Sequence, residues 1–137
     1  MRTVFADTVY WVAIINPRDK FHRSAAAKVE SLGEHRIVTS ELVLVEVLNM
    51  LSGHGPELRH GAVELAETVA DDESVDLVPS SVQLFRGALA LYRDRPDKRW
   101  SLTDCASFRI MEQRQITEAL TQDRHFEQYG FRALLRD

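Results

Sequence analysis

Four acidic residues stand at points of the chain where a carboxylate could take part in chemistry. Asp7 follows the apolar run Thr3–Ala6, Glu46 lies inside another apolar stretch, Asp104 follows Ser-Leu-Thr, and Asp123 follows Leu-Thr-Gln. Carboxylates within about 6 Å of one another repel and raise each other's pKa unless a cation joins them. Oxygen ligands without thiolates or paired histidines favour Mg²⁺ or Mn²⁺ over zinc. If the four residues meet, they form a divalent-metal site whose bound water can attack a phosphodiester.

The sequence offers no competing catalytic motif. It contains no G-x-x-x-x-G-K-[ST] phosphate loop and no G-x-G-x-x-G dinucleotide fingerprint. Its one cysteine, Cys105, excludes an internal disulfide and a thiolate zinc site within one chain. Because Cys105 has no visible base partner, it is expected to be a small core residue. The lone thiol favours a reducing, cytoplasmic setting.

Each acidic residue also has a purely structural interpretation. Asp104 stands three residues after Ser101, a spacing that predicts a capping box at a helix start, worth about 1 kcal/mol or less. Asp7 fits a turn at a strand end, and Asp123 fits the cap of a short helix that follows it. Glu46 has mostly apolar neighbours, so a structural role would need a partner such as a buried arginine.

Composition indicates one soluble globular domain. With 137 residues, 45% of them hydrophobic, the chain is long enough for one core and too short for two. No apolar run reaches the roughly 18–20 residues of a membrane helix, and a secretory signal is not expected. The net charge of −4 gives no general attraction to nucleic acid. Three bulky aromatic residues are expected in the core or in an interface: Tyr10, Trp11 and Trp100. Four histidines are expected mostly at the surface: His22, His54, His60 and His125.

Strand and helix patterns alternate along the chain. Strands are predicted at residues 3–7, 36–39, 75–78, 116–120 and 131–135, and helices at 8–16, 22–32, 41–52, 57–71, 82–93, 102–113 and 124–129. This alternation predicts an α/β sandwich around a mostly parallel sheet. The helix at 41–52 is expected to be buried nearly all round, since only Glu46 and Asn49 are polar between Leu42 and Leu51. The helix at 82–93 is expected to bury one face, made of Leu84, Phe85, Ala88, Leu91 and Tyr92.

The predicted topology lets the four carboxylates converge. In such a fold, strand ends and helix starts meet at the carboxyl edge of the sheet, where ligands usually bind. Asp7 and Asp123 follow strands, and Asp104 lies in the first turn of its helix, so all three face this edge. Glu46 lies roughly 9 Å from the start of its helix at 1.5 Å per residue, still within side-chain reach.

The order of these motifs resembles the PIN domain. The resemblance rests on Asp7-Thr8, on Glu46 in Val-Glu-Val-Leu-Asn, on Asp104 in Ser-Leu-Thr-Asp-Cys and on Asp123 in Leu-Thr-Gln-Asp. Within that family the chain is similar to the VapC-like toxins of bacterial toxin–antitoxin pairs. The resemblance runs from residue 3 to residue 135. It implies a PIN-like three-layer sandwich, with residues 1–137 forming a single domain.

The resemblance also implies an activity, that of an endoribonuclease dependent on Mg²⁺ or Mn²⁺. The metal-binding and catalytic acids would be Asp7, Glu46, Asp104 and Asp123, and the hydroxyls lining the site would be Thr8 and Thr121. The family often has a small polar residue where this chain has Val9, which removes one local hydrogen bond. Family members usually form homodimers and are inhibited by a small antitoxin protein.

Basic residues next to the motifs are expected to hold phosphates of an RNA substrate, namely Lys98, Arg99, Arg124 and His125. Two other functions remain open. One is a non-catalytic PIN-like module that binds RNA or a protein. The other is a phosphotransfer receiver or a haloacid-dehalogenase-like phosphatase, which the sequence disfavours because Val9 stands where a second acid is needed.

Overall fold

The central strand, β1 (Arg2–Ala6), carries the first acidic residue at its carboxyl end. In the computed structural model, which describes residues 1–137, β1 lies in a five-stranded sheet of order β3-β2-β1-β4-β5. β2 (His35–Ser40) and β3 (Val75–Val78) lie to one side of β1, and β4 (Glu118–Leu120) and β5 (Arg132–Ala133) to the other. Every neighbouring pair is parallel, so all strand ends share one edge. The sheet is therefore entirely parallel.

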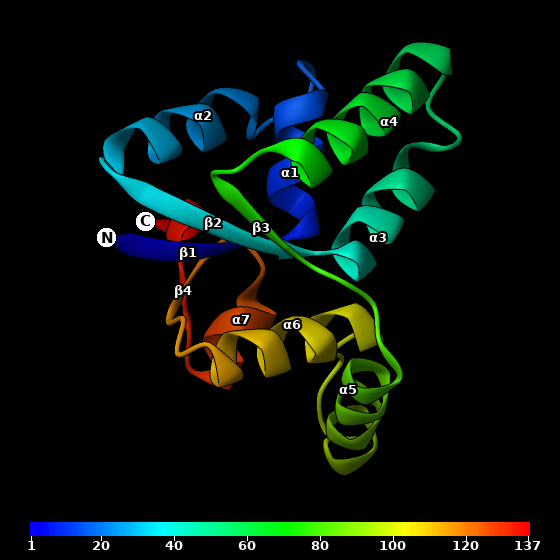
Figure 1. Ribbon diagram of the computed structural model, residues 1–137, viewed down its shortest axis with the longest axis vertical. Helices are drawn as coiled ribbons and strands as arrows, with labels where there is room; N and C mark the ends of the chain where they lie inside the picture. The colour runs from blue at the N-terminus through cyan, green and yellow to red at the C-terminus, as the bar shows by residue number, and fades with distance from the viewer.

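Helices cover both faces of this sheet, which confirms the predicted three-layer α/β sandwich. The first three strands are connected by α1 (Thr8–Ile15), α2 (His22–Ser31), α3 (Glu41–Leu51) and α4 (Pro56–Asp71). Figure 1 shows α1, α2 and α4 on one side of the sheet and α5, α6 and α7 on the other. α3 packs against both α1 and α4 and also touches α6.

The chain changes direction across the sheet after β3. From this edge strand, α5 (Val82–Asp94) and α6 (Leu102–Gln113) lead past β2 and β1 to β4, and α7 (Arg124–Tyr129) then leads to β5. The strand order therefore reverses between β1 and β4. In open parallel sheets, the crevice at such a switch point is where ligands bind.

An aromatic cluster holds α6 and α7 together. The Phe108 ring on α6 makes edge-to-face contacts with Phe126 on α7 and with Trp100, at centroid distances of 5.0 and 5.1 Å. It also stacks on Tyr129 at 4.7 Å. Phe108 and Phe126 are fully buried. Such aromatic pairs contribute about 0.5–1.5 kcal/mol beyond the area they bury, so they fix the relative position of the two helix N-termini.

Two expectations about helix burial are wrong. α3 is not buried nearly all round, because Val45 is 51% and Met50 46% exposed. On α5, Ala88 and Leu91 are buried as predicted, but Phe85 is 48% and Tyr92 53% exposed. The exposure of these side chains follows from which elements pack against α3 and α5. Each helix packs its buried side chains against the rest of the fold, and no element of the chain covers the adjacent apolar side chains.

Two predicted strands are shorter than expected. The fourth begins at Glu118 rather than at Ile116, since the Ile116 N–H still bonds to the Met111 carbonyl of the preceding helix end. The fifth contains only Arg132–Ala133. It gives way to a 3₁₀ turn over Leu134–Arg136, where the Leu135 N–H donates to the Thr121 carbonyl at 3.0 Å. That bond ties the C-terminal segment to the loop after β4.

Candidate metal-binding site

Asp7 lies where β1 ends and α1 begins, in an extended conformation with φ −88° and ψ 167°. Its side chain is buried between β1 and β4, at the switch point of the sheet. The Thr121 hydroxyl donates to Asp7 Oδ2 at 2.8 Å. The Asp7 N–H donates to the Leu120 carbonyl at 3.3 Å, which continues the pairing of the two strands by one residue. Asp7 is therefore held by hydrogen bonds of both its backbone and its side chain to the segment Leu120–Thr121.

The surroundings of Asp7 disfavour its ionised form. Burial is the main cause that raises the pKa of this carboxyl from 3.8 to about 7. The negative charges of Asp104 and Glu46 raise the pKa further, whereas the Thr121 hydrogen bond lowers it. The fold thus holds three acidic groups close enough to repel one another. A cation among them would relieve that repulsion.

Asp104 caps its helix in a way that leaves it available for a second role. Its N–H donates to Ser101 Oγ and its Oδ2 accepts from the Ser101 N–H, both at 3.0 Å, which confirms the capping box of α6. The same Oδ2 lies 2.9 Å from Nδ1 of His125. Burial raises the pKa of Asp104, and the Asp123 charge adds to that effect. Because both contacts use Oδ2, Oδ1 makes no hydrogen bond and is free to bind a ligand.

Thr121 connects Asp7 to the loop that carries Asp123. Its hydroxyl oxygen accepts the Asp123 N–H at 3.0 Å while its own hydrogen goes to Asp7. Asp123 in turn caps α7, because its Oδ1 accepts the His125 N–H at 2.9 Å. Capping fixes the direction of this carboxylate, as it does for Asp104. The fully buried Thr121 thus joins two of the predicted acids in one hydrogen-bonded chain.

Glu46 is the fourth of the predicted acidic residues. It is half-buried on α3 and makes no hydrogen bond or ion pair, so the buried-arginine alternative is wrong. Its charge acts on Asp7, whose pKa it raises. Glu46 therefore lies close enough to Asp7 for its charge to act on that carboxyl, and it lacks a cationic partner of its own.

This donor set fits a divalent cation. Asp104, Asp123 and His125 each offer one ligand atom, and these three atoms lie within 4.8 Å of one another. Asp7 and Glu46 lie outside this group of three, but the charges of Asp104 and Glu46 act on Asp7, and no arginine or lysine neutralises Asp7 or Glu46. Thr8, directly after Asp7, has a buried hydroxyl with no hydrogen-bond partner. Buried polar atoms normally have partners, so this hydroxyl is consistent with a site that is completed by a ligand.

The comparison of the sequence with known families agrees with this geometry. The sequence profile of the PIN domain matches residues 4–132. The chain belongs to the PIN-domain family. Among solved structures it is similar to VapC20 of Mycobacterium tuberculosis, described as a Sarcin-Ricin loop cleaving toxin. The two share 25% sequence identity and a TM-score of 0.84, covering 93% of this chain and 95% of the other. No curated protein matches the sequence significantly.

Three of the residues predicted to bind phosphate lie outside the carboxylate cluster of this PIN domain. Lys98 is half-buried, Arg99 and Arg124 are exposed, and none of them pairs with an acidic side chain. Lys98 and Arg99 line a cavity of about 440 Å³ beside Tyr92 and Trp100, next to the start of α6. These cations are therefore free to meet an anionic ligand.

His125 is the residue whose place the sequence interpretation missed. The sequence predicts His125 at the surface or on a substrate phosphate, but its Nδ1 lies 2.9 Å from Asp104 Oδ2 and 3.4 Å from Asp123 Oδ1. A local signal was available. A side chain two residues after an N-cap can turn back toward the capping carboxylate, as the imidazole of His125 does toward Asp123.

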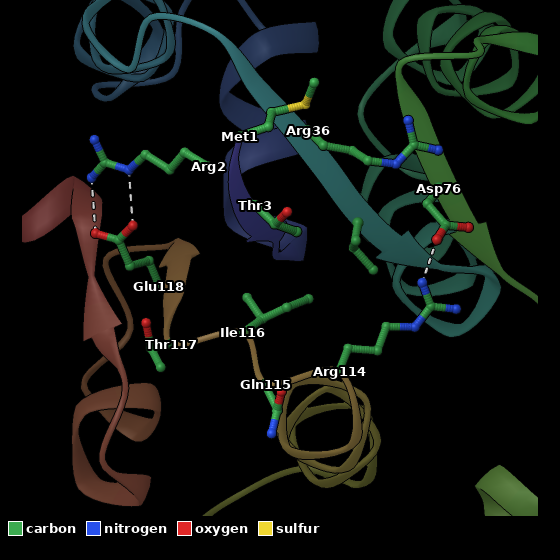
Figure 2. Close-up of a pocket in the computed structure, with 11 residues that line it drawn as sticks. Met1, Arg2, Thr3, Arg36, Asp76, Arg114, Gln115, Ile116, Thr117 and Glu118 are labelled. Atoms are coloured by element: carbon green, nitrogen blue, oxygen red, sulfur yellow. Dashed lines mark hydrogen bonds and ion pairs between the residues drawn. The ribbon is translucent and has the colours of Figure 1, made fainter.

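The largest cavity of the PIN domain lies elsewhere. It measures about 650 Å³ and opens at the amino-terminal edge of the sheet, opposite the carboxylates. Figure 2 shows its charged side chains in pairs: Arg2 with Glu118, and Arg114 with Asp76. Arg36 donates to the Glu73 carbonyl at 3.2 Å. Four of its five charged side chains are thus paired with one another, and the fifth, Arg36, binds a backbone carbonyl, so this cavity lacks the unpaired carboxylates found at the opposite edge of the sheet.

None of the helices is both long enough and apolar enough to span a membrane.

Proposed function

We propose that this chain, acting as one domain over residues 1–137, is an endoribonuclease that hydrolyses RNA phosphodiester bonds at an Mg²⁺ or Mn²⁺ site. The observation that carries the proposal is the buried Asp7 at the switch point of the sheet, whose pKa is raised to about 7 by burial and by the charges of Asp104 and Glu46. Asp104 in turn has its pKa raised by burial and by the charge of Asp123. Membership of the PIN family and the similarity to a Sarcin-Ricin loop cleaving toxin support RNA as the substrate.

In the proposed reaction, Asp7 and Asp104 hold the metal directly, while Glu46 and Asp123 hold it through water or orient the attacking water. When bound there, a divalent ion would supply an activated water as nucleophile and would offset the charge that develops on the phosphate. The protein's own contribution is positioning. Thr121 fixes one oxygen of Asp7, and the capping box fixes one oxygen of Asp104. Each carboxylate thereby keeps one oxygen in a defined direction, and Thr8 lines the same site.

The RNA backbone is proposed to lie along the basic side chains that have no acidic partner. Lys98, Arg99 and Arg124 flank the N-termini of α6 and α7, which carry Asp104 and Asp123. Phosphate contacts of this kind position a substrate without reading its sequence. They would bring a phosphodiester of either a structured or a single-stranded RNA to the carboxylates.

We further propose that the chain is the cytoplasmic toxin of a toxin–antitoxin pair, that a small antitoxin protein inhibits it, and that it forms a homodimer. The similarity to VapC20, described as a toxin, supports the toxin assignment, and the antitoxin follows from the resemblance to toxins of toxin–antitoxin pairs. A stripe of exposed apolar side chains on α5 supports self-association: Val82, Phe85, Leu89 and Tyr92. Their spacing places all four on one side of the helix, and exposed apolar patches of this kind mark interaction surfaces.

The test is cleavage of structured RNA by the purified chain, with a sarcin–ricin-loop hairpin and transfer RNA as substrates and with Mg²⁺, Mn²⁺ or EDTA. Cleavage should require the metal. Asp104→Asn should lower the rate by at least about 100-fold, because asparagine keeps an acceptor for the Ser101 N–H but removes the charge. Asp71→Asn, on an exposed carboxylate at the end of α4, is the matched control.

Two results would contradict the proposal. If Asp104→Asn cleaves as fast as the wild type, the assignment of the site is wrong. If the wild type binds Mn²⁺ and RNA but cleaves neither substrate, a non-catalytic binding module explains the chain better.

A further inference from the structure

His125 lies inside the carboxylate cluster rather than beside it. Its Nδ1 is 2.9 Å from Asp104 Oδ2 and 3.4 Å from Asp123 Oδ1, and no other protein group contacts this nitrogen. The side chain is 27% exposed. An imidazole in this position is either an internal partner of two carboxylates or the third member of a ligand set.

The separations fit a ligand set. An octahedral Mg²⁺-sized ion binds its ligands at about 2.0–2.1 Å, so two ligands at right angles lie about 3 Å apart. The two nitrogen–oxygen distances at His125 are 2.9 and 3.4 Å. One small ion could therefore bind His125 Nδ1 together with Asp104, and the Asp123 carboxylate, 3.4 Å from Nδ1, would lie close enough to hold that ion through water.

The surrounding fold fixes the imidazole where it stands. The backbone N–H of His125, in the first turn of α7, donates to Asp123 Oδ1 at 2.9 Å. The next residue, Phe126, is fully buried against Phe108 of α6, the helix that carries Asp104. Packing between α6 and α7 thus sets the distance from His125 to Asp104. Ligands held in advance in this way need little reorganisation when a metal binds.

We propose that His125 supplies a nitrogen ligand to the divalent metal and thereby makes the site favour Mn²⁺ or a related first-row transition ion over Mg²⁺. This inference rests on the proposed function, because it concerns the same metal site. Magnesium is a hard ion that takes oxygen ligands and keeps several waters. Imidazole suits transition ions better, so a mixed set of one nitrogen and several carboxylate oxygens discriminates against Mg²⁺.

The test is pulsed electron paramagnetic resonance of the intact chain loaded with Mn²⁺, with Mn²⁺ and Mg²⁺ affinities measured by calorimetry. The wild type should show the ¹⁴N coupling of a directly bound imidazole, and labelling with ¹⁵N-histidine should change it. His125→Gln should remove the coupling and weaken Mn²⁺ binding about 10- to 100-fold, with a smaller effect on Mg²⁺. His54→Gln, an exposed histidine beyond the end of α3, is the matched control and should change neither.

The outcomes separate this inference from the proposed function. If the wild type binds Mn²⁺ without nitrogen coupling, His125 is only a partner of Asp104 and Asp123, and the carboxylate site stands without it. Equal loss of Mn²⁺ and Mg²⁺ affinity in His125→Gln would also overturn the selectivity. If the wild type binds no Mn²⁺ at all, both the inference and the metal-dependent function are wrong. The wild-type spectrum decides the matter even if a variant folds poorly.

Discussion

Replacing Asp7 by asparagine should stabilise the metal-free protein, although it should abolish metal binding. In the folded state the pKa of Asp7 is raised from 3.8 to about 7, chiefly by burial. The folded protein therefore binds more protons than the unfolded chain between these two values. Stability contributed by the protonated carboxyl is present at low pH and is lost as the pH rises from about 4 through about 7. Asparagine has no proton to lose and keeps an oxygen that can accept from Thr121.

The size of the effect follows from the two pKa values. Each unit corresponds to about 1.4 kcal/mol, so ionised Asp7 costs the metal-free protein about 4 kcal/mol at pH above about 7. At about pH 5 the cost is about 1.7 kcal/mol, because the folded carboxyl is still protonated there. The stability advantage of Asp7→Asn should thus grow by about 2.5 kcal/mol between about pH 5 and about pH 8.

Urea unfolding in the presence of EDTA, followed by circular dichroism at several pH values, measures this difference. Glu67→Gln, an exposed carboxylate on α4, controls for the loss of one negative charge and should show no such trend. Added Mn²⁺ should reverse the order, because a ligand stabilises only the protein that binds it. An advantage of Asp7→Asn that is the same at every pH would refute the reasoning.

Two further predictions concern the elements around the site. Ser101→Ala removes the acceptor for the Asp104 N–H, and it should lower the free energy of unfolding by about 1 kcal/mol in urea titration; an unchanged midpoint would show that the capping box contributes nothing. Phe85→Arg places a charge on the exposed stripe of α5, where Phe85 is 48% exposed. Analytical ultracentrifugation should then show a dimeric wild type and a monomeric variant of unchanged thermal stability, and a monomeric wild type would contradict the proposed homodimer.

The secondary structure and the order of the acidic residues followed from local sequence. Ser40, Ser81 and Ser101 start their helices because a serine hydroxyl accepts an otherwise unpaired N–H at each helix start. Strands of apolar residues between helices required a parallel sheet, and a parallel sheet required that Asp7 and Asp123 leave it at the same edge. These features depend on residues that are neighbours along the chain, so the sequence alone was enough to predict them.

What surrounds each side chain was decided only by the tertiary structure. A helical period of 3.6 residues defines the faces of α5, but it does not say that Ala88 would be covered and Phe85 exposed. The same period could not separate the exposed Val45 from the buried Val47 on α3.

In the carboxylate site, too, local sequence determined some features and tertiary structure determined others. Local sequence put Asp104 at the start of a capped helix, yet its contact with His125 spans 21 positions and depends on how Phe108 packs against Phe126. The raised pKa of Asp7 likewise comes mainly from burial between two strands that are distant in sequence. Side-chain identity fixes which groups are available for chemistry. Packing between distant segments fixes which of these groups meet, because only folding brings distant residues into contact and removes their side chains from water.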